Sequence, residues 1–260
     1  MHDIIILGGG PAGYLAAERA GHAGLDTVLV EEKSLGGVCL NEGCVPSKTL
    51  LNSAKIFDYS RYGDKYGVTT TGAALDQKAV IARKNKVVKN LVAGIKGQMR
   101  ANHVKVIEAK GEILGRQGNV ISVKAGDEIL QAERLLIATG SQAIVPPIPG
   151  VREGYDAGYV LTNREILDLE IIPENMVVVG GGVIGLEMAG YFNSAGSKVT
   201  VIEMLDKIAG TTDRDISTIL QKNFEKKGVV IKLSSKVTAV KKGLVEYEEN
   251  GEIKSVDADY

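Results

Sequence analysis

The sequence predicts an α/β protein of two Rossmann-like dinucleotide-binding βαβ domains, and three observations support this fold class. The pattern Gly-x-Gly-x-x-Gly occurs twice, each time after an aliphatic run and before a helical pattern. The two copies align without a gap at a shift of 172 residues, so the chain contains an internal repeat. Short alternating runs between glycine turns predict antiparallel meanders. We therefore expect parallel sheets with antiparallel meanders, and two long helices inserted in the first domain.

The first glycine motif, at residues 8–13, has the features of a nucleotide-binding turn. Gly8 allows a tight turn, Gly10 lets backbone N–H groups approach a pyrophosphate, and Gly13 lets the helix lie close to the strand. The next predicted strand ends at Glu31, 23 residues after Gly8, where a carboxylate can accept hydrogen bonds from a ribose. The alternative is a glycine-rich turn that serves only packing.

The only two cysteines, Cys39 and Cys44, lie in the run Gly-Gly-Val-Cys-Leu-Asn-Glu-Gly-Cys-Val-Pro-Ser-Lys at residues 36–48. A helical pattern follows, and Pro46 is allowed in its first turn. Cys44 is thus expected near a helix N-terminus, where the helix dipole favours a thiolate. The pair is therefore interpreted as a redox-active dithiol, and the alternative is a pair of unreactive structural thiols.

Zinc is a poor explanation for the cysteines. Two thiols do not complete a tetrahedral site, and His2, His22 and His103 are not at ligand spacing. We expect no metal.

Composition narrows the class of protein. The 260 residues suffice for one large or two ordinary domains, and the net charge of −1 gives no reason to expect nucleic acid or an anionic membrane as partner. No apolar run approaches the roughly 20 residues that span a bilayer, and the N-terminus does not resemble a signal peptide. We expect a cytoplasmic protein, a compartment in which a close cysteine pair is typically catalytic or redox-sensing.

The middle of the chain predicts the two long helices, within residues 50–103, around a polar turn near 64–72. The second helix carries a basic cluster, interpreted as a solvated face with an acidic partner as the alternative. The cluster consists of Arg83, Lys84, Lys86 and Lys89. The proline-rich segment Pro146–Gly150 is the best candidate linker. We expect domains at 1–147 and 148–260.

The second glycine motif repeats the first at Gly180, Gly182 and Gly185. Its second predicted strand ends at Glu203, again 23 residues after the first glycine. A carboxylate there hydrogen-bonds a free 2′-hydroxyl and repels a 2′-phosphate, and the next four residues contain no arginine. NAD is therefore favoured over NADP.

Two nucleotide motifs with Cys-x-x-x-x-Cys between them resemble the flavoprotein disulfide reductases. The spelling of the cysteine run, with the later Gly-Gly-Gly-Val-Ile-Gly-Leu-Glu at 180–187, is most similar to the dihydrolipoamide dehydrogenases. The resemblance covers the whole chain. It implies FAD on the first motif, NAD on the second, and oxidation of protein-bound dihydrolipoamide through a Cys39–Cys44 redox disulfide.

The resemblance also implies residue roles. Cys39 would exchange with the substrate, Cys44 would face the flavin, and Lys48, paired with Glu187, would lie near flavin N5. For Lys48 and Glu187 the alternative is ordinary surface charges. The implied FAD contacts are Gly8, Gly10, Pro11, Ala12, Gly13, Glu31, Gly37, Val38, Cys39, Lys48, Gly111, Ala138, Thr139 and Gly140. The implied NAD contacts are Gly180, Gly182, Val183, Ile184, Gly185, Glu203 and Val237.

The sequence departs from the family pattern in lacking the C-terminal interface domain and its His-Glu base. We expect an N-terminal portion: an FAD-binding domain without its C-terminal strand, an NAD-binding domain incomplete at its end, and impaired activity. The implied partners are a lipoyl domain of a 2-oxo acid dehydrogenase or glycine-cleavage complex and, at full length, a second copy in a homodimer. The alternatives are a non-catalytic nucleotide-binding or redox-sensing module and, within the enzyme class, another disulfide reductase.

Overall fold

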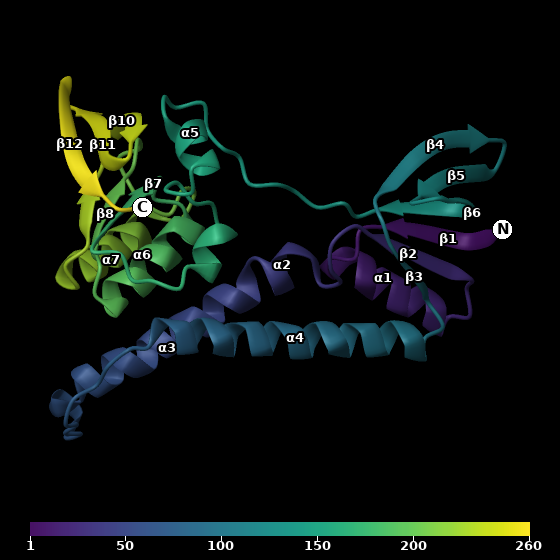
Figure 1. The fold of residues 1–260 in the computed structure, drawn as a ribbon, viewed down its shortest axis with the longest axis horizontal. Helices are drawn as coiled ribbons and strands as arrows, with labels where there is room; N and C mark the ends of the chain where they lie inside the picture. The colour runs from purple at the N-terminus through teal and green to yellow at the C-terminus, as the bar shows by residue number, and fades with distance from the viewer. The chain divides into compact units, whose positions relative to one another are not determined.

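The computed structural model describes residues 1–260 and divides them into two compact units, drawn in Figure 1. The first unit comprises Met1–Pro46 and Lys84–Gln142, and the second comprises Ser47–Arg83 and Ala143–Tyr260. No helix is both long and apolar enough to span a membrane.

The first unit contains one six-stranded sheet, in the order β3-β2-β1-β6-β5-β4. The strands are β1 (His2–Leu7), β2 (Thr27–Glu31), β3 (Lys105–Glu108), β4 (Gly111–Gln117), β5 (Val120–Ala125) and β6 (Glu128–Ile137). Strands β3, β2, β1 and β6 are parallel, and β5 and β4 continue the sheet in antiparallel fashion. The predicted parallel strands and meander are therefore confirmed, and they share one sheet.

Both faces of β1 are covered, which explains its unbroken aliphatic run. Ile5 packs with residues of β5 and β6, whereas Ile6 packs with Ala17 of α1 (Pro11–His22) and Met99 of α4 (Gln77–Ala101). Ile5 and Ile6 have no exposed surface, as expected for successive residues of a strand buried on both sides.

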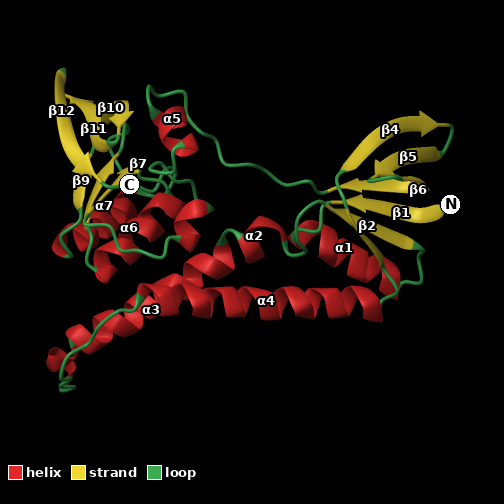
Figure 2. Ribbon diagram, in the orientation of Figure 1, coloured by secondary structure: helices red, strands yellow, loops and turns green.

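The two predicted long helices are α3 (Cys44–Arg61) and α4, with a short 3-10 helix, η1 (Gly63–Tyr66), between them (Figure 2). They follow the first βαβ segment in the chain, but Ser47–Arg83 belongs to the second unit, so the expectation that both are inserted in the first domain holds only in part. One prediction for the basic cluster is wrong, because Lys84 is 3% exposed and is not on a solvated face.

The second unit contains two three-stranded sheets. The parallel sheet is β7 (Asn175–Val179), β8 (Lys198–Ile202) and β9 (Val230–Lys232), and the antiparallel sheet is β10 (Ser235–Lys241), β11 (Gly243–Glu249) and β12 (Glu252–Ala258). Its other helices are α5 (Val151–Asp156), η2 (Glu165–Asp168), α6 (Val183–Ala195) and α7 (Arg214–Lys226). The second βαβ repeat is thus present as β7-α6-β8.

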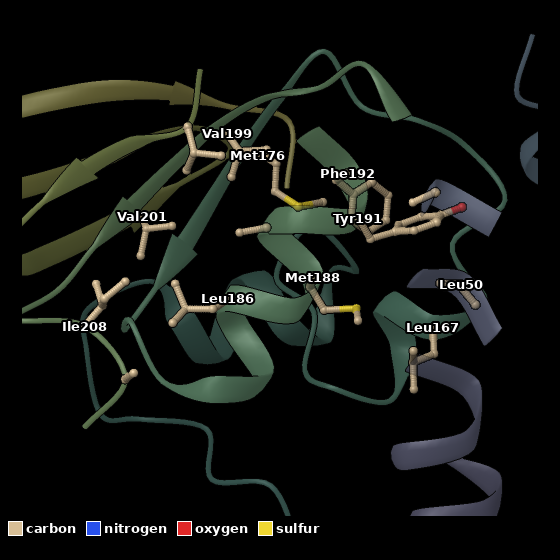
Figure 3. Packing of buried hydrophobic residues seen from close by; sticks show 14 of the residues in the cluster. Leu50, Leu167, Met176, Leu186, Met188, Tyr191, Phe192, Val199, Val201 and Ile208 are labelled. Atoms are coloured by element: carbon tan, nitrogen blue, oxygen red, sulfur yellow. The ribbon is translucent and has the colours of Figure 1, made fainter. Parts of the chain in front are cut away.

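Helix α6 lies at the centre of this unit's core, as Figure 3 shows. Leu186, Met188 and Tyr191 of α6 pack with β-strand residues on one side and with Leu50 of α3 on another. Ile81 of α4 joins the same cluster. The segments Ser47–Arg83 and Ala143–Tyr260 therefore share one hydrophobic core.

Residues 256–260, at the end of the described chain, extend from β12 to β7. Val256 to Ala258 belong to β12. The next two residues lie along β7, where Asp259 N donates to Asn175 O at 2.9 Å and Val177 N donates to Tyr260 O at 3.0 Å.

Candidate functional site

The two cysteines form a disulfide within the first unit. Cys39 lies in the short helix α2 (Gly37–Asn41), Cys44 is the first residue of α3, and their Cα atoms are 4.6 Å apart. The predicted pairing and the position of Cys44 at a helix N-terminus are both confirmed.

Asn41 fixes the loop that carries Cys39, a role that the sequence analysis missed. Its Nδ2 donates to the backbone oxygens of Leu35 and Gly37, at 3.1 and 3.0 Å. Gly36, with a φ of 102°, supplies the left-handed turn before α2. An asparagine two residues after a cysteine is too common a pattern for the sequence to have revealed this brace.

The disulfide loop packs directly on the first glycine loop. Gly36 N donates to Gly9 O at 2.8 Å. A Cβ on Gly37 would lie 2.6 Å from the Cα of Gly10, closer than real side chains allow. Two backbone segments thus meet two residues before Cys39, which places the redox pair beside the predicted nucleotide-binding turn.

The glycine loop is closely packed where the motif requires glycine. A Cβ on Gly8 would lie 2.2 Å from Ala138 O, and one on Gly13 would lie 1.7 Å from Gly8 O. Beside Gly10, by contrast, the nearest atom to an added Cβ is 3.7 Å away. Gly10 caps α1 without a side-chain hydrogen bond, so no side chain competes for the first N–H groups. These features fit a dinucleotide pyrophosphate.

Glu31, at the end of β2, is held by backbone donors. Its Oε2 accepts from Gly9 N at 2.6 Å, and its Oε1 accepts from Lys33 N and Ser34 N at 2.8 and 3.2 Å. A carboxylate has about four acceptor positions, so capacity for a ribose hydroxyl remains. The Glu31 carboxylate therefore fits as an acceptor for a ribose hydroxyl at the adenosine end of FAD.

The remaining predicted FAD contacts surround this loop or start nearby strands. Pro11 and Ala12 form the first turn of α1, Val38 precedes Cys39 in α2, and Gly111 begins β4. Thr139 and Gly140 follow β6, whose end is fixed beside β1 by Ala138 N donating to Leu7 O at 2.8 Å. In the sheet, β1 has β2 as its neighbour on one side and β6 on the other. The chain continues from β1 to β2, so the carboxyl end of β1 is the topological switch point at which such sheets bind ligands.

The second unit repeats the arrangement around α6. Glu203 accepts from Gly181 N at 2.6 Å and from Leu205 N at 2.7 Å, as Glu31 does from its own loop. A Cβ on Gly185 would lie 2.8 Å from a methyl carbon of Val178, whereas one on Gly180 or Gly182 would meet nothing within 4 Å. As in the first motif, the third glycine of the second motif is closely packed, and the second glycine has open space beside it.

The other predicted NAD contacts fall into two groups. Val183 and Ile184 begin α6 and are 63% and 55% exposed. Val237 lies in β10, where it is buried in the core opposite Tyr247 of β11, so its contact with NAD stays a prediction.

The first arginine after Glu203 in the sequence is Arg214, which pairs with Asp206. Arg214 Nη2 lies 2.7 Å from Asp206 Oδ2, and this guanidinium lowers the pKa of Asp206. The arginine is separated from Glu203 by 10 residues in sequence, but it is occupied by a carboxylate.

Lys48 and Glu187 lie together in the second unit, with Nζ and Oε1 3.8 Å apart. The predicted pairing is present, although Lys48 is 70% and Glu187 is 30% exposed, so the pair by itself stabilises the fold by at most about 1 kcal/mol. Its position near a flavin stays a prediction.

The second unit also contains a partly open, mostly apolar pocket of about 340 Å³. Ile184, Gly185 and Met188 of α6 line it, together with Tyr155 and Tyr159. Glu203 is not part of its wall. No group of three or more His, Cys, Asp or Glu side chains is arranged to hold a metal.

Two βαβ units with glycine loops, one packed against a disulfide, define a nucleotide-dependent disulfide oxidoreductase. The chain belongs to the pyridine nucleotide-disulphide oxidoreductase family, whose model matches residues 2–260. It is 42% identical over 259 residues to the dihydrolipoyl dehydrogenase of Acholeplasma laidlawii, covering 99% of this chain and 76% of that protein. It is 40% identical to the dihydrolipoyl dehydrogenase of Mycoplasma genitalium, covering 99% of this chain and 56% of that protein.

Solved structures agree with this assignment. The HOCl-induced flavoprotein disulfide reductase RclA from Escherichia coli superposes with a TM-score of 0.81 at 29% identity, covering 99% of this chain and 55% of that one. Its Cu(II) complex gives the same TM-score and identity, over 98% of this chain. The chain thus spans about half the length of these structures, and the predicted family is confirmed.

Proposed function

We propose that this chain carries the dithiol and nucleotide sites of an FAD-dependent oxidoreductase that oxidises protein-bound dihydrolipoamide with NAD+. The observation that carries the proposal is the Cys39–Cys44 disulfide on a loop whose Gly36 and Gly37 pack on the first glycine motif. The dihydrolipoyl dehydrogenases at about 40% identity support the choice of dithiol.

In the proposed reaction the disulfide of Cys39 and Cys44 accepts two electrons from the substrate dithiol in two thiol–disulfide exchange steps. One substrate thiolate attacks Cys39 Sγ, the Cys39–Cys44 bond breaks, and Cys44 leaves as a thiolate. The second substrate thiolate then attacks the substrate sulfur bound to Cys39 and releases the Cys39 thiolate. The substrate becomes a disulfide, and the cysteine pair gains two electrons. Because Cys44 begins an 18-residue helix, the dipole of α3 stabilises the thiolate that forms there.

The nucleotide sites divide the remaining work. Gly8, Gly10, Gly13 and Glu31 would hold FAD, and Gly180, Gly182, Gly185 and Glu203 would hold NAD. FAD held at the first motif would supply an acceptor for the two electrons of the cysteine pair, and NAD+ held at the second would supply the acceptor of a hydride. Lys48 would place a positive charge near flavin N5, and Glu187 would keep that charge paired.

The partner would be a lipoyl domain of a 2-oxo acid dehydrogenase or glycine-cleavage complex, and the whole protein would act as a cytoplasmic homodimer. The alternative function is reduction of another disulfide substrate, because the RclA disulfide reductase structures share the fold at 29% identity.

The test is an anaerobic titration of the FAD-reconstituted chain with dihydrolipoamide. Two-electron reduction should produce a long-wavelength charge-transfer band from the Cys44 thiolate, and Cys44→Ser should abolish it. Cys39→Ser, the matched control, should retain a band without needing reduction. Persistence of the band in Cys44→Ser would contradict the assigned roles, and no reduction by dihydrolipoamide at all would contradict the proposed substrate.

A further inference from the structure

Helix α4 has an unusual charge for this protein. Gln77–Ala101 contains seven basic residues and no acidic one, whereas the whole chain has a net charge of −1. The remaining residues therefore carry a net charge of −8 (−1 minus +7). Such an asymmetry is typical of a surface that meets an anionic partner.

Within the first unit the basic residues form one stripe. Lys86, Lys89, Lys96 and Arg100 follow at intervals of 3, 7 and 4 residues, which places them on one face of the helix. All four are exposed. Met99, three residues after Lys96, borders this face and has no exposed surface, because it packs with Ile6 and Ala17 in the core. Figure 1 shows α4 beside α1, on one side of the six-stranded sheet.

The charges of the stripe are largely uncompensated. Lys96 pairs with Glu108 at 2.8 Å, and this contact lowers the pKa of Glu108. Lys86, Lys89 and Arg100 have no carboxylate oxygen within 4.0 Å. Like charges at this density repel one another, so an anionic partner would relieve the repulsion.

The composition of the stripe distinguishes among anionic partners. It contains no aromatic residue on which a base could stack, and three of its four cations are lysines, which act as point charges and not as planar phosphate forks. Met99 and Ile95 pack in the core of the first unit, and Leu91 is the only large apolar side chain of α4 that is exposed, so α4 has no continuous apolar face to insert into a bilayer. An acidic protein surface remains the best match.

We propose that the stripe Lys86, Lys89, Lys96 and Arg100 steers an acidic dithiol-carrying protein domain toward this chain. That the partner carries a dithiol rests on the proposed function. That the partner is acidic rests on the positive charge of α4. Steering raises the association rate over distances comparable with the Debye length, so its signature is a rate that falls with added salt.

The test follows reduction of the Cys39–Cys44 disulfide by thiol alkylation and mass measurement, which needs no bound cofactor. The reductants are an acidic dihydrolipoyl-bearing domain, the same domain with its surface carboxylates neutralised, and free dihydrolipoamide. The double variant Lys86→Glu/Lys89→Glu should slow the acidic domain about tenfold at low salt, and high salt should remove the difference. Its rate with free dihydrolipoamide should be unchanged.

A matched control changes the net charge equally at a distant surface. Lys236 and Lys242, both exposed in the second unit, give Lys236→Glu/Lys242→Glu. An equal loss in this control, or no loss in the α4 variant, would overturn the inference. Failure of free dihydrolipoamide to reduce the wild-type disulfide would instead contradict the proposed function.

In that event the stripe is tested by equilibrium binding alone. The wild-type chain should bind a labelled Glu/Asp-rich peptide at least about tenfold more tightly than Lys86→Glu/Lys89→Glu does. Equal binding by both, or stronger binding of the wild type to a single-stranded oligonucleotide or to phosphatidylserine vesicles, would show that no acidic protein surface is the partner.

Discussion

The amide oxygen of Gln77 accepts a hydrogen bond of 2.5 Å from the hydroxyl of Tyr191, 114 residues away in the sequence. Tyr191 has no exposed surface and Gln77 is 6% exposed. The amide nitrogen of Gln77 donates to Leu169 O at 2.6 Å. The first residue of α4 is therefore bound to α6 and to the segment before β7 by a satisfied, buried polar contact.

Removing one partner of this contact should destabilise the second unit. Gln77→Ala leaves the Tyr191 hydroxyl and the Leu169 oxygen without their partner, which should cost about 1–3 kcal/mol in the free energy of unfolding. Urea unfolding followed by circular dichroism measures the change. Gln131→Ala, on the exposed side of β6, is the control and should have an effect below about 0.5 kcal/mol. A similar loss in both variants would show that the buried contact contributes nothing specific.

The same tyrosine predicts a pH dependence. Burial raises the pKa of Tyr191 to about 12, against a hydrogen bond to Gln77 that lowers it. Since the pKa is near 10 in the unfolded chain, the contribution to stability is complete below pH 10 and is lost as the pH rises toward 12. The difference of about 2 between the folded and unfolded pKa values corresponds to nearly 3 kcal/mol of unfolding free energy. The unfolding free energy should therefore fall less steeply with pH in Tyr191→Phe than in the wild type, and parallel curves would disprove the linkage.

Gly37 should tolerate no side chain. In Gly37→Ala the methyl group would lie 2.6 Å from Gly10 Cα at a φ of 59°, so the disulfide loop must move from the glycine loop. The Kd for FAD should rise at least about tenfold, which corresponds to 1.4 kcal/mol. Isothermal titration with FAD gives the value.

Gly67→Ala is the matched control for that experiment. Gly67 has a φ of 76°, but an added Cβ would meet nothing within 4 Å, so the variant carries the backbone strain without the clash. It should lose about 1 kcal/mol of stability and keep its affinity for FAD. If Gly67→Ala weakened FAD binding as much, the clash at Gly10 would not be the cause.

Glu203 should determine the choice of nicotinamide cofactor. Glu203→Ala removes the acceptor for the ribose hydroxyl and the negative charge that repels a 2′-phosphate. The Kd for NADH should rise about tenfold or more, and the ratio of NADPH to NADH affinity should increase. Glu31→Ala, the equivalent change in the first unit, should leave NADH binding unchanged. A loss of NADH affinity in Glu31→Ala alone would reverse the assignment of the two motifs.

Local patterns predicted most of the fold. The aliphatic runs, the two glycine motifs and the turns around the meander each specify an element through neighbouring residues. Helix α4, expected between the polar turn near 64–72 and residue 103, lies at Gln77–Ala101 for this reason. The cysteine pair was equally easy to predict, because Cys39 and Cys44 are only five positions apart in the sequence.

Several features that depend on distant contacts were not predicted, and the Lys48–Glu187 pair was expected only because the family resemblance implies it. Lys84 was assigned to a solvated face by the surrounding basic residues, whereas tertiary packing buries it. Nothing in the sequence near Gln77 indicates its contact with Tyr191. The brace from Asn41 depends on a turn at Gly36 whose φ of 102° cannot be inferred from composition. Such residues are specified by three-dimensional neighbours and not by a sequence period.

The backbone contact between residues 36–37 and 9–10 limits how this chemistry can be engineered. Grafting the cysteine pair onto another scaffold would transfer the sulfur atoms without the surface against which their loop is shaped. A successful transplant would have to move Gly8–Gly13 and Gly36–Cys44 together, as one cassette. Because Gly8 packs against Ala138, a portable version of this redox centre would also need the end of β6, and is therefore much larger than a six-residue motif.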